Sequence, residues 1–257
     1  MIEDFLAGGR DKHLVPHLAV AGGCAVSRLS LAELAARCEA EGEEAVARRY
    51  LGDSEFAQWQ GFRLHKRRLE WLGGRIAAKD AAMRLREAAC PERDWRQWQL
   101  AVLPSGRPVL AAGVTPLPEI SIAHSGGWAT AMASGNRCGI DIQQRQETVV
   151  RVKARFCSAA EAERLTASLG GLAEVERLTL LWAAKEAIRK ALPVTPLPAF
   201  MEMECLAVDG AASGPMLFAC CFRRPPQGLQ LAVGVVLERD CAVALVAVAT
   251  NHQPGEK

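Results

Sequence analysis

The chain has 257 residues, a formal net charge of +2, and 31 basic against 29 acidic side chains. This length allows one large domain or two small ones with a true hydrophobic core, and the near-balance of charge excludes a global attraction to nucleic acids or membrane surfaces. With 50% hydrophobic and 23% charged residues, the composition is that of an ordinary globular protein.

The N-terminus and the cysteines both favour a cytoplasmic location. Residues 1–5 are acidic where a signal peptide would be basic, and no apolar run approaches the ~20 residues of a membrane span. The nine cysteines include no Cys-x-x-Cys pair, and an odd number in a long chain argues against a disulfide framework. We therefore expect most of them to be small buried hydrophobic residues.

The first half of the chain is predicted to contain two long helices flanked by strands. The expected elements are a strand at 18–26, helices at 30–49 and 62–89, and a strand at 95–102. The spacing from Ser30 to Glu33 is that of a capping box, which opens the first helix. Gly73-Gly74 interrupts the second helix, where a kink or a break is expected. Residues 109–118 contain Pro and Gly without a period and are predicted as an irregular loop.

The second half has the clearer pattern. The expected elements are short strands at 119–123, 128–133 and 138–142, helices at 158–170 and 174–192, and strands at 204–208, 229–237 and 241–249. Gly126-Gly127 and Gly135-Asn136 separate the three short strands, which predicts a three-stranded antiparallel meander. Pro193 ends the last helix. A meander beside a long helix favours an α+β fold, and no sequence repeat is evident.

Two carboxylates on separate predicted elements are the main candidates for chemistry. Asp141 lies between two isoleucines of a strand, where an unpaired charge is costly. Trp182, Glu186 and Lys190 share one face of the last helix because they are spaced four residues apart. Lys185 lies about 100° round the helix from Glu186. Two carboxylates with lysines suit a divalent metal that holds a phosphate. The alternatives are a solvated Glu–Lys pair and, for Asp141, a structural salt bridge or an exposed position.

His124 is a candidate ligand-binding residue. It ends a predicted strand and enters a glycine turn, where such residues are common. A partly exposed loop histidine is the alternative. Ser125 beside it lacks a Gly-x-Ser-x-Gly elbow, which argues against hydrolase chemistry.

Basic side chains are concentrated between residues 63 and 79, with Glu70 as the only acid. They are Arg63, His65, Lys66, Arg67, Arg68, Arg75 and Lys79. Such a run is typical of a solvated helix face or a nucleic-acid patch. Aromatic residues are few here, which argues against a stacking surface for single strands. Arg107, in a Gly-Arg-Pro turn, adds a candidate phosphate contact.

Taken in order, these motifs resemble those of the Sfp-type 4′-phosphopantetheinyl transferases. That family has a Gly-x-Asp-x-Glu strand followed by a Trp-x-x-Lys-Glu-Ala/Ser-x-x-Lys helix, and the counterparts here are Gly139–Gln143 and Trp182–Lys190. The turn Ala123–Gly126, the basic segment Arg67–Lys79 and the turn Gly106–Pro108 match three further motifs. Each motif is weak alone, but five in the right order are specific.

The resemblance implies a fold and an assembly. The family fold is an α+β pseudo-dimer of two similar halves, with antiparallel sheets and packed long helices, and coenzyme A lies in the cleft between the halves. This implies a division into residues 1–138 and 139–257. A monomer is implied as well, because one chain already supplies both halves of the cleft.

The resemblance also implies a reaction. The 4′-phosphopantetheine arm of coenzyme A moves to a serine of an apo acyl or peptidyl carrier protein, and 3′,5′-ADP leaves. Asp141 and Glu186 would hold Mg²⁺ on the diphosphate, and Glu186, or a water beside it, would take the serine proton. Lys190 would stabilise charge on the leaving phosphate, with help from Lys185. No nucleic acid or membrane is expected as a partner.

Further contacts to the coenzyme A phosphates are implied for His124 and Arg107, with Arg75 and Lys66 as helpers. One residue departs from the family pattern. Gln143 stands where the family most often has a second Glu, and it shares a face of the strand with Asp141. Gln143 can offer Mg²⁺ a neutral oxygen or leave the position to water, and either way one negative charge is lost. The alternative function is a non-catalytic relative that binds coenzyme A or a carrier protein.

Overall fold

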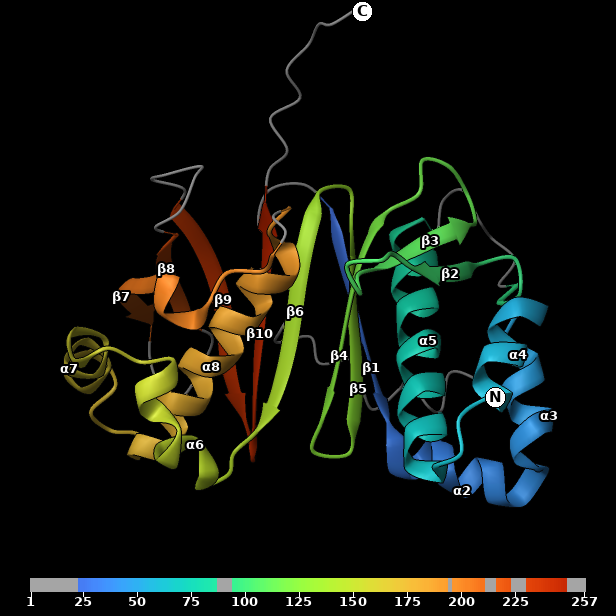
Figure 1. Ribbon diagram of the computed structural model, residues 1–257, viewed down its shortest axis with the longest axis horizontal. Helices are drawn as coiled ribbons and strands as arrows, with labels where there is room; N and C mark the ends of the chain where they lie inside the picture. Colours follow the sequence, from blue (N-terminus) through green and yellow to red (C-terminus); the bar gives the residue numbers. More distant parts are fainter. Residues whose placement is uncertain (1–22, 87–93, 194–195, 211–215, 223–229, 249–257) are drawn as a thin grey trace, which may run out of the picture.

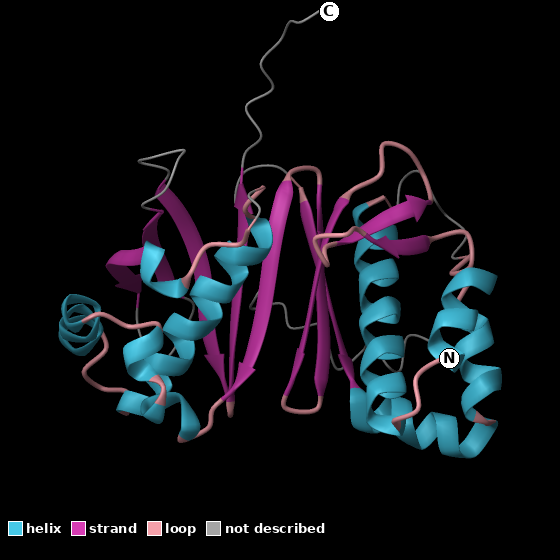
Figure 2. Ribbon diagram, in the orientation of Figure 1, coloured by secondary structure: helices cyan, strands magenta, loops and turns pink. Residues whose placement is uncertain are grey.

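The computed structural model describes residues 23–86, 94–193, 196–210, 216–222 and 230–248. It is a mixed α+β fold with antiparallel sheets, as predicted. Two sheets lie against each other in the middle of the molecule, and a long helix covers the outer side of each (Figure 1). Colouring by secondary structure shows the same order of helix, sheet, sheet and helix (Figure 2).

The first half contains one three-stranded sheet, a two-stranded sheet and four helices among its described residues. Its elements are β1 (Cys24–Ser30), α2 (Leu31–Glu41), α3 (Glu43–Tyr50), α4 (Asp53–Gln60), α5 (His65–Leu85), β2 (Gln99–Val102), β3 (Pro108–Ala112), β4 (Glu119–Ser125) and β5 (Trp128–Ser134). The larger sheet has the order β1-β5-β4, and β2 pairs with β3.

The second half contains a five-stranded sheet in the order β6-β10-β9-β8-β7. Its elements are β6 (Arg137–Gln144), α6 (Thr148–Arg151), η2 (Lys153–Arg155), α7 (Ala159–Ser168), α8 (Glu174–Ala191), η3 (Phe200–Glu202), β7 (Met203–Gly210), β8 (Met216–Phe222), β9 (Gln230–Glu238) and β10 (Cys241–Val248). β8 has no counterpart among the predicted strands.

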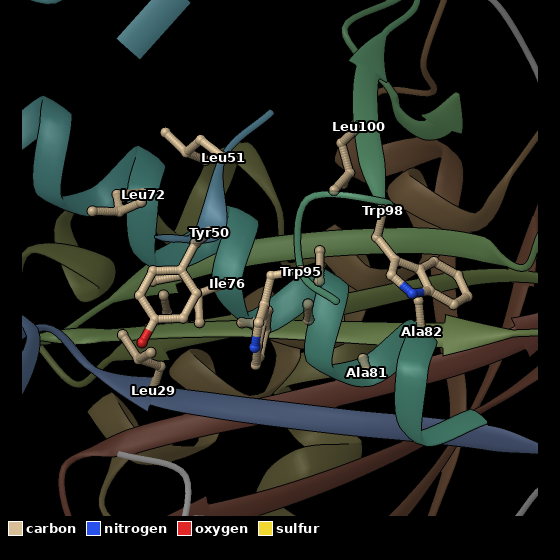
Figure 3. Close-up of a cluster of buried hydrophobic side chains, with 14 of the residues drawn as sticks. Leu29, Tyr50, Leu51, Leu72, Ile76, Ala81, Ala82, Trp95, Trp98 and Leu100 are labelled. Atoms are coloured by element: carbon tan, nitrogen blue, oxygen red, sulfur yellow. The ribbon is translucent and has the colours of Figure 1, made fainter. Parts of the chain in front are cut away.

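Helix α5 forms the core of the first half against β1, β5 and β4. It runs through Gly73-Gly74 as one continuous helix, so the predicted break is absent. A Cβ added to Gly73 would lie 2.6 Å from a methyl group of Leu31, which shows that the glycine allows close packing. Beside α5, the rings of Tyr50 and Trp95 pack edge to face at 5.2 Å (Figure 3).

Several local predictions were wrong for identifiable reasons. The predicted helix 30–49 is two helices, because Gly42 adopts a φ of 88° between α2 and α3. The predicted loop 109–118 begins within strand β3. The predicted strand 18–26 is found at Cys24–Ser30, and residues 18–22 lie outside the described part of the chain.

The predicted three-stranded meander is also wrong. β4 and β5 form a hairpin, but β6 leaves that sheet and pairs with β10 instead. The two sheets then pack through buried residues of both: Ala123, Met132, Cys138, Ile140, Ile142, Cys241, Val243 and Leu245. Chain order suggested that β6 would continue the hairpin sheet. Burial against the apolar strand β10 outweighs that local preference.

The two halves share an internal arrangement that the sequence pattern did not reveal. In the first half, Lys79 on α5 donates to Glu55 and to the carbonyl of Tyr50, both at 2.5 Å. In the second half, Lys185 on α8 bonds Glu161 at 2.7 Å and the carbonyl of Phe156 at 2.6 Å. The sequence separations match, at 24 and 29 residues in both halves.

The two glutamates also have equivalent backbone partners. Glu55 accepts from the N–H groups of Gly52 and Leu100. Glu161 accepts from those of Ser158 and Cys205. This repetition of a buried ion pair supports two similar halves, although the sequences show no evident repeat.

Three other sequence predictions concern the chain as a whole. The division at residue 138 stays a prediction, and it would fall within the first residues of β6. None of the eight described cysteines forms a disulfide with another described cysteine, and Cys90 lies outside the described ranges. Among the described helices, none combines the length and apolar composition needed to cross a membrane.

Candidate active site

The site is centred on strand β6, which lies between helix α8 and strand β4. Cys138, Ile140 and Ile142 point into the contact between the sheets. Successive side chains of a strand alternate, so Asp141 lies on the opposite face, toward α8. The fold therefore positions one carboxylate of the sheet directly beside the long helix.

Gly139 allows this close approach of strand and helix. A Cβ at this position would lie 1.9 Å from the carbonyl oxygen of Ala187. That oxygen belongs to the backbone of α8 and cannot move alone. Any larger residue at position 139 would therefore push α8, with its functional side chains, away from Asp141.

Lys190 connects the two halves at this point. Its Nζ donates to Asp141 Oδ1 at 2.8 Å and to the carbonyl of Ile140 at 3.0 Å. It also donates to the carbonyl of Ile122 on β4 at 3.2 Å. The side chain remains 28% exposed, so an anion can reach the ammonium group from solvent.

Asp141 is held in an unfavourable environment for a charge. Burial raises the pKa of its carboxyl to about 6, although attraction to Lys190 opposes the shift, and the negative charge of Glu186 adds to it. Its second oxygen, Oδ2, is buried and has no hydrogen-bond partner. A buried carboxylate oxygen without a partner is costly unless a cation completes the site.

Glu186 is the second carboxylate and lies close enough to Asp141 to affect its pKa. It forms an ion pair with Arg189 at 2.8 Å, and both side chains are partly exposed. Among the described residues, no three His, Cys, Asp or Glu side chains lie together as a metal site. A divalent ion here would therefore need neutral oxygen ligands besides these two carboxylates, and the half-buried Gln143 lies on the same face of β6 as Asp141.

His124 lies next to this centre at the end of β4. Its Nδ1 is 3.9 Å from Glu70 on α5, and its side chain is 39% exposed. Burial lowers the pKa of His124, and the charges of Arg67, Lys190 and Lys66 lower it further while Glu70 opposes them. The lowered pKa keeps the imidazole mostly neutral at pH 7.

A cavity of about 270 Å³, which we call the Arg107 cavity, opens on one side of the centre. Its cationic lining residues are Arg107, Arg137, Arg189 and Lys190. Arg107 is fixed by an ion pair with Glu119 and donates to the carbonyl of Lys190 at 3.2 Å. Four cations around a small cavity suit a phosphorylated ligand.

A second cavity of about 670 Å³, which we call the α2 cavity, opens on the other side. Its walls come from α2, from α5, from the turn after β4 and from the end of β6. Its polar lining residues are Lys66, Glu70, His124, Ser125, Gln144 and Gln146. Because His124 lines this cavity and feels the charge of Lys190, the cavity adjoins the Asp141 centre.

The structure does not bring two of the predicted phosphate ligands to the site. Lys185 has no exposed surface and uses its donors on Glu161 and on the carbonyls of Phe156 and Phe200. Arg75 is buried in the first half, 3.6 Å from Glu55 and stacked on Trp71. Neither residue lines one of the two cavities: the Lys185 side chain has no exposed surface, and the Arg75 side chain is 6% exposed.

Sequence reasoning missed several residues that the structure gathers here. Arg137 and Arg189 line the Arg107 cavity, and Glu70 faces His124. Arg189 was detectable as the residue three positions after Glu186 on one helix face. Arg137 carried no signal, because its place at the start of β6 depends on the pairing of β6 with β10.

A comparison with known families matches the part of the chain that contains the site residues of β6 and α8. Residues 137–246 match the model of the 4′-phosphopantetheinyl transferase superfamily. The matched segment includes Asp141, Glu186 and Lys190, and it covers fewer than half of the chain's residues. A search of curated proteins gives no significant match.

Solved structures of holo-[acyl-carrier-protein] synthases show weak overall similarity. The enzyme from Bacillus anthracis, in complex with CoA (3′,5′-ADP), is 21% identical and matches 43% of this chain and 92% of its own, with a TM-score of 0.38. The synthase from Neisseria meningitidis is 18% identical over 43% and 94% of the two chains, also with a TM-score of 0.38. That from Thermotoga maritima is 22% identical over 52% and 74%, with a TM-score of 0.35.

Proposed function

We propose that this protein is a phosphopantetheinyl transferase of the Sfp type. It transfers the 4′-phosphopantetheine arm of coenzyme A to a serine hydroxyl of an apo acyl or peptidyl carrier protein and releases 3′,5′-ADP. The observation that carries the proposal is the ion pair of the buried Asp141 with the partly exposed Lys190, beside Glu186 and within the segment that matches the superfamily. We further propose that the enzyme acts as a cytoplasmic monomer.

The residues around Asp141 fit a magnesium ion. The orphaned Oδ2 of Asp141, the nearby carboxylate of Glu186 and the neutral side chain of Gln143 are oxygen ligands of the kind Mg²⁺ prefers. When bound, the ion would neutralise charge on the diphosphate of coenzyme A. Mg²⁺ keeps several waters in most protein sites, which suits a set of only two carboxylates.

Lys190 contributes the fixed positive charge of the reaction. Its ammonium group is held by Asp141 and two backbone carbonyls, so it needs no rearrangement to face the diphosphate. It stabilises the charge that develops on 3′,5′-ADP as the phosphorus–oxygen bond breaks. Glu186 accepts the proton of the carrier serine, because its carboxylate is partly exposed to an incoming protein.

The remaining residues bind and orient coenzyme A. Arg107 binds a phosphate of the nucleotide in the Arg107 cavity, and His124 binds the diphosphate next to Lys190. Lys66 is 87% exposed and acts at the mouth of the α2 cavity. An anion beside His124 raises its pKa, so the imidazole becomes a charged donor when coenzyme A is bound.

Mass spectrometry of a carrier protein tests the proposed function. We expect an apo acyl carrier protein, incubated with coenzyme A, Mg²⁺ and this protein, to gain the mass of one phosphopantetheine group. Glu186→Ala should lower the rate by about 100- to 1000-fold, because both proton acceptor and metal ligand are removed. Glu44→Ala, an exposed substitution on α3, is the matched control and should keep full activity.

The same assay distinguishes the transferase from the main alternative function. A non-catalytic relative would bind coenzyme A with measurable affinity and yet leave several unrelated apo carriers unmodified. The position that favours this alternative is Gln143, where the family most often has a carboxylate. That outcome would contradict the transferase proposal.

Gln143→Glu should change the magnesium requirement. A carboxylate at position 143, on the same face of β6 as Asp141, adds one negative charge to the metal site. The affinity of such a site for its cation rises with the charge of the ligands. We expect the Mg²⁺ concentration for half-maximal rate to fall roughly tenfold. Gln60→Glu at the exposed end of α4 adds the same charge elsewhere and serves as the control. An unchanged Mg²⁺ dependence in Gln143→Glu would remove Gln143 from the metal site.

A further inference from the structure

Two cysteines face each other across the outermost pair of strands in the five-stranded sheet. Cys205 on β7 is the direct partner of Cys220 on β8, and the two strands are antiparallel. Directly opposed residues of antiparallel strands place their Cα atoms about 4.5 or 5.5 Å apart and their side chains on the same face. Disulfides form between residues whose Cα atoms are about 4.4–6.8 Å apart. The strand register therefore holds this pair of thiols within reach of a disulfide in either case.

The two thiols interact with each other inside the core of the second half. Both belong to its buried hydrophobic cluster. The Cys220 thiol donates a hydrogen bond to Cys205, which lowers the pKa of Cys205 and raises the pKa of Cys220. The charge of Lys185 lowers the pKa of Cys205 further, whereas burial and the charge of Glu161 oppose the shift. Cys205 is therefore the thiol of the pair that ionises first, and the thiolate is the reactive form of a cysteine.

The packing around the buried glutamates does not require a thiol at position 205. The backbone N–H of Cys205 donates to Glu161 at 2.9 Å. The equivalent donor to Glu55 in the first half is the N–H of Leu100, which is buried as well. A leucine thus occupies the corresponding place in the first half, so packing alone does not explain a facing pair of cysteines in the second.

Strand β7 gives a small oxidant a route to the pair. It is an edge strand of the sheet, and β8 is its only described strand partner (Figure 1). The register of the two strands shifts between Cys205 and Ala207, and Leu206 at this irregularity is 39% exposed. An edge strand with an interrupted ladder opens locally at a lower cost than the whole fold. Hydrogen peroxide is small enough to enter through such an opening.

We propose that Cys205 and Cys220 are a site of reversible oxidation, at which a peroxide converts the two thiols into a disulfide that fixes β7 to β8. The Cys205 thiolate attacks one oxygen of hydrogen peroxide, the oxygen–oxygen bond breaks, and the leaving hydroxide takes up the proton that Cys205 released. Cys205 is then a sulfenic acid. The Cys220 sulfur displaces its hydroxyl group, which leaves as a second water with the Cys220 proton. The two sulfur atoms lose two electrons in total, and the peroxide gains them.

The disulfide also strengthens the attachment of β7 to the helices. Because the N–H of Cys205 binds Glu161, and Glu161 pairs with Lys185 on α8, a covalent bond at Cys205 holds the strand at this junction. The pair lies outside the linings of the Arg107 cavity and the α2 cavity. Its oxidation therefore acts on the stability of the second half and leaves the residues that line the cavities unmodified.

Peptide mapping without a reducing agent tests the assignment. The folded protein is treated with hydrogen peroxide, its remaining thiols are blocked, and it is then digested. We expect a crosslinked peptide pair that joins Cys205 to Cys220 and is two hydrogens lighter than the reduced peptides. Cys220→Ser should abolish this product. Cys221→Ser is the matched control and should keep it, because Cys221 is the partner of Glu204 and lies on the opposite face of β8 from Cys220.

Thermal unfolding of the wild type measures the consequence without any variant. Oxidation should raise the Tm by about 5–10 °C, because a disulfide that closes a loop of about 15 residues constrains the unfolded chain. Dithiothreitol should reverse the shift. A crosslink from Cys205 to the neighbouring Cys157, a sulfonic acid at Cys205, or intact thiols at both positions after prolonged peroxide treatment would each overturn the proposal. A Tm that stays the same or falls when the crosslink forms would overturn it as well.

Discussion

Lys185→Met is expected to lower the free energy of unfolding by about 3–5 kcal/mol, the effect of removing one partner from a buried ion pair. Glu161 is only 2% exposed and would be left as an unpaired buried carboxylate. The carbonyls of Phe156 and Phe200 would lose their donor as well. Urea unfolding at neutral pH measures the loss.

The equivalent ion pair of Lys79 and Glu55 in the first half allows a matched comparison with Lys185 and Glu161. Lys79→Met should cause a similar loss, because Lys79 pairs with the buried Glu55 in the first half. The double variant Lys185→Met, Glu161→Gln should recover part of the stability, since the unpaired charge is gone. If Lys185 instead held a phosphate, Lys185→Met would keep its stability and bind coenzyme A more weakly, and the structural role would be refuted.

Asp141→Asn is expected to make the metal-free protein more stable above pH 6 while abolishing most of its activity. Burial raises the pKa of Asp141 from 3.8 to about 6. Such a shift corresponds to about 3 kcal/mol that the charged carboxylate costs the folded state. Asparagine has nearly the same shape without the charge, and its oxygen still accepts from Lys190.

The effect has a defined pH window. Below pH 3.8 the carboxyl is neutral in the folded and unfolded states, and above about pH 6 it is charged in both. Between these values the folded state binds more protons, so the stability of the wild type falls as pH rises. The advantage of the variant should therefore grow from pH 4 to pH 6 and then level off. Denaturant unfolding with a chelator present measures it, and a pH-independent difference would contradict the assignment.

The two predictions describe opposite uses of buried charge. Lys185 and Glu161 neutralise each other and hold α7, α8 and β7 together. Asp141 is also buried, but its Oδ2 has no hydrogen-bond partner, and this lowers the stability of the folded protein. Buried carboxylates without a partner are typical of ligand-binding sites. Asp141→Asn should lower carrier modification by about 100- to 1000-fold for this reason.

The sequence by itself determined the elements with strong local signals. Helix α8 follows from its apolar period and from Pro193, and helix α7 from the capping box that Ser158 begins. The place of Asp141 inside an apolar strand predicted that its charge needs a partner, and Lys190 is such a partner in the structure. The α+β class and the pairing of β4 with β5 followed from the same local patterns.

Only the tertiary structure decided which charged residues face a ligand and which face each other. Lys185 and Lys190 lie on one helix with similar surroundings in sequence. Lys185 is nevertheless fully buried in an ion pair with Glu161, whereas Lys190 binds Asp141 and a carbonyl of β4. Likewise, the pairing of β6 with β10 brings Arg137 to the Arg107 cavity. These outcomes depend on contacts between segments far apart in the chain, and local sequence patterns do not encode the burial that those contacts create.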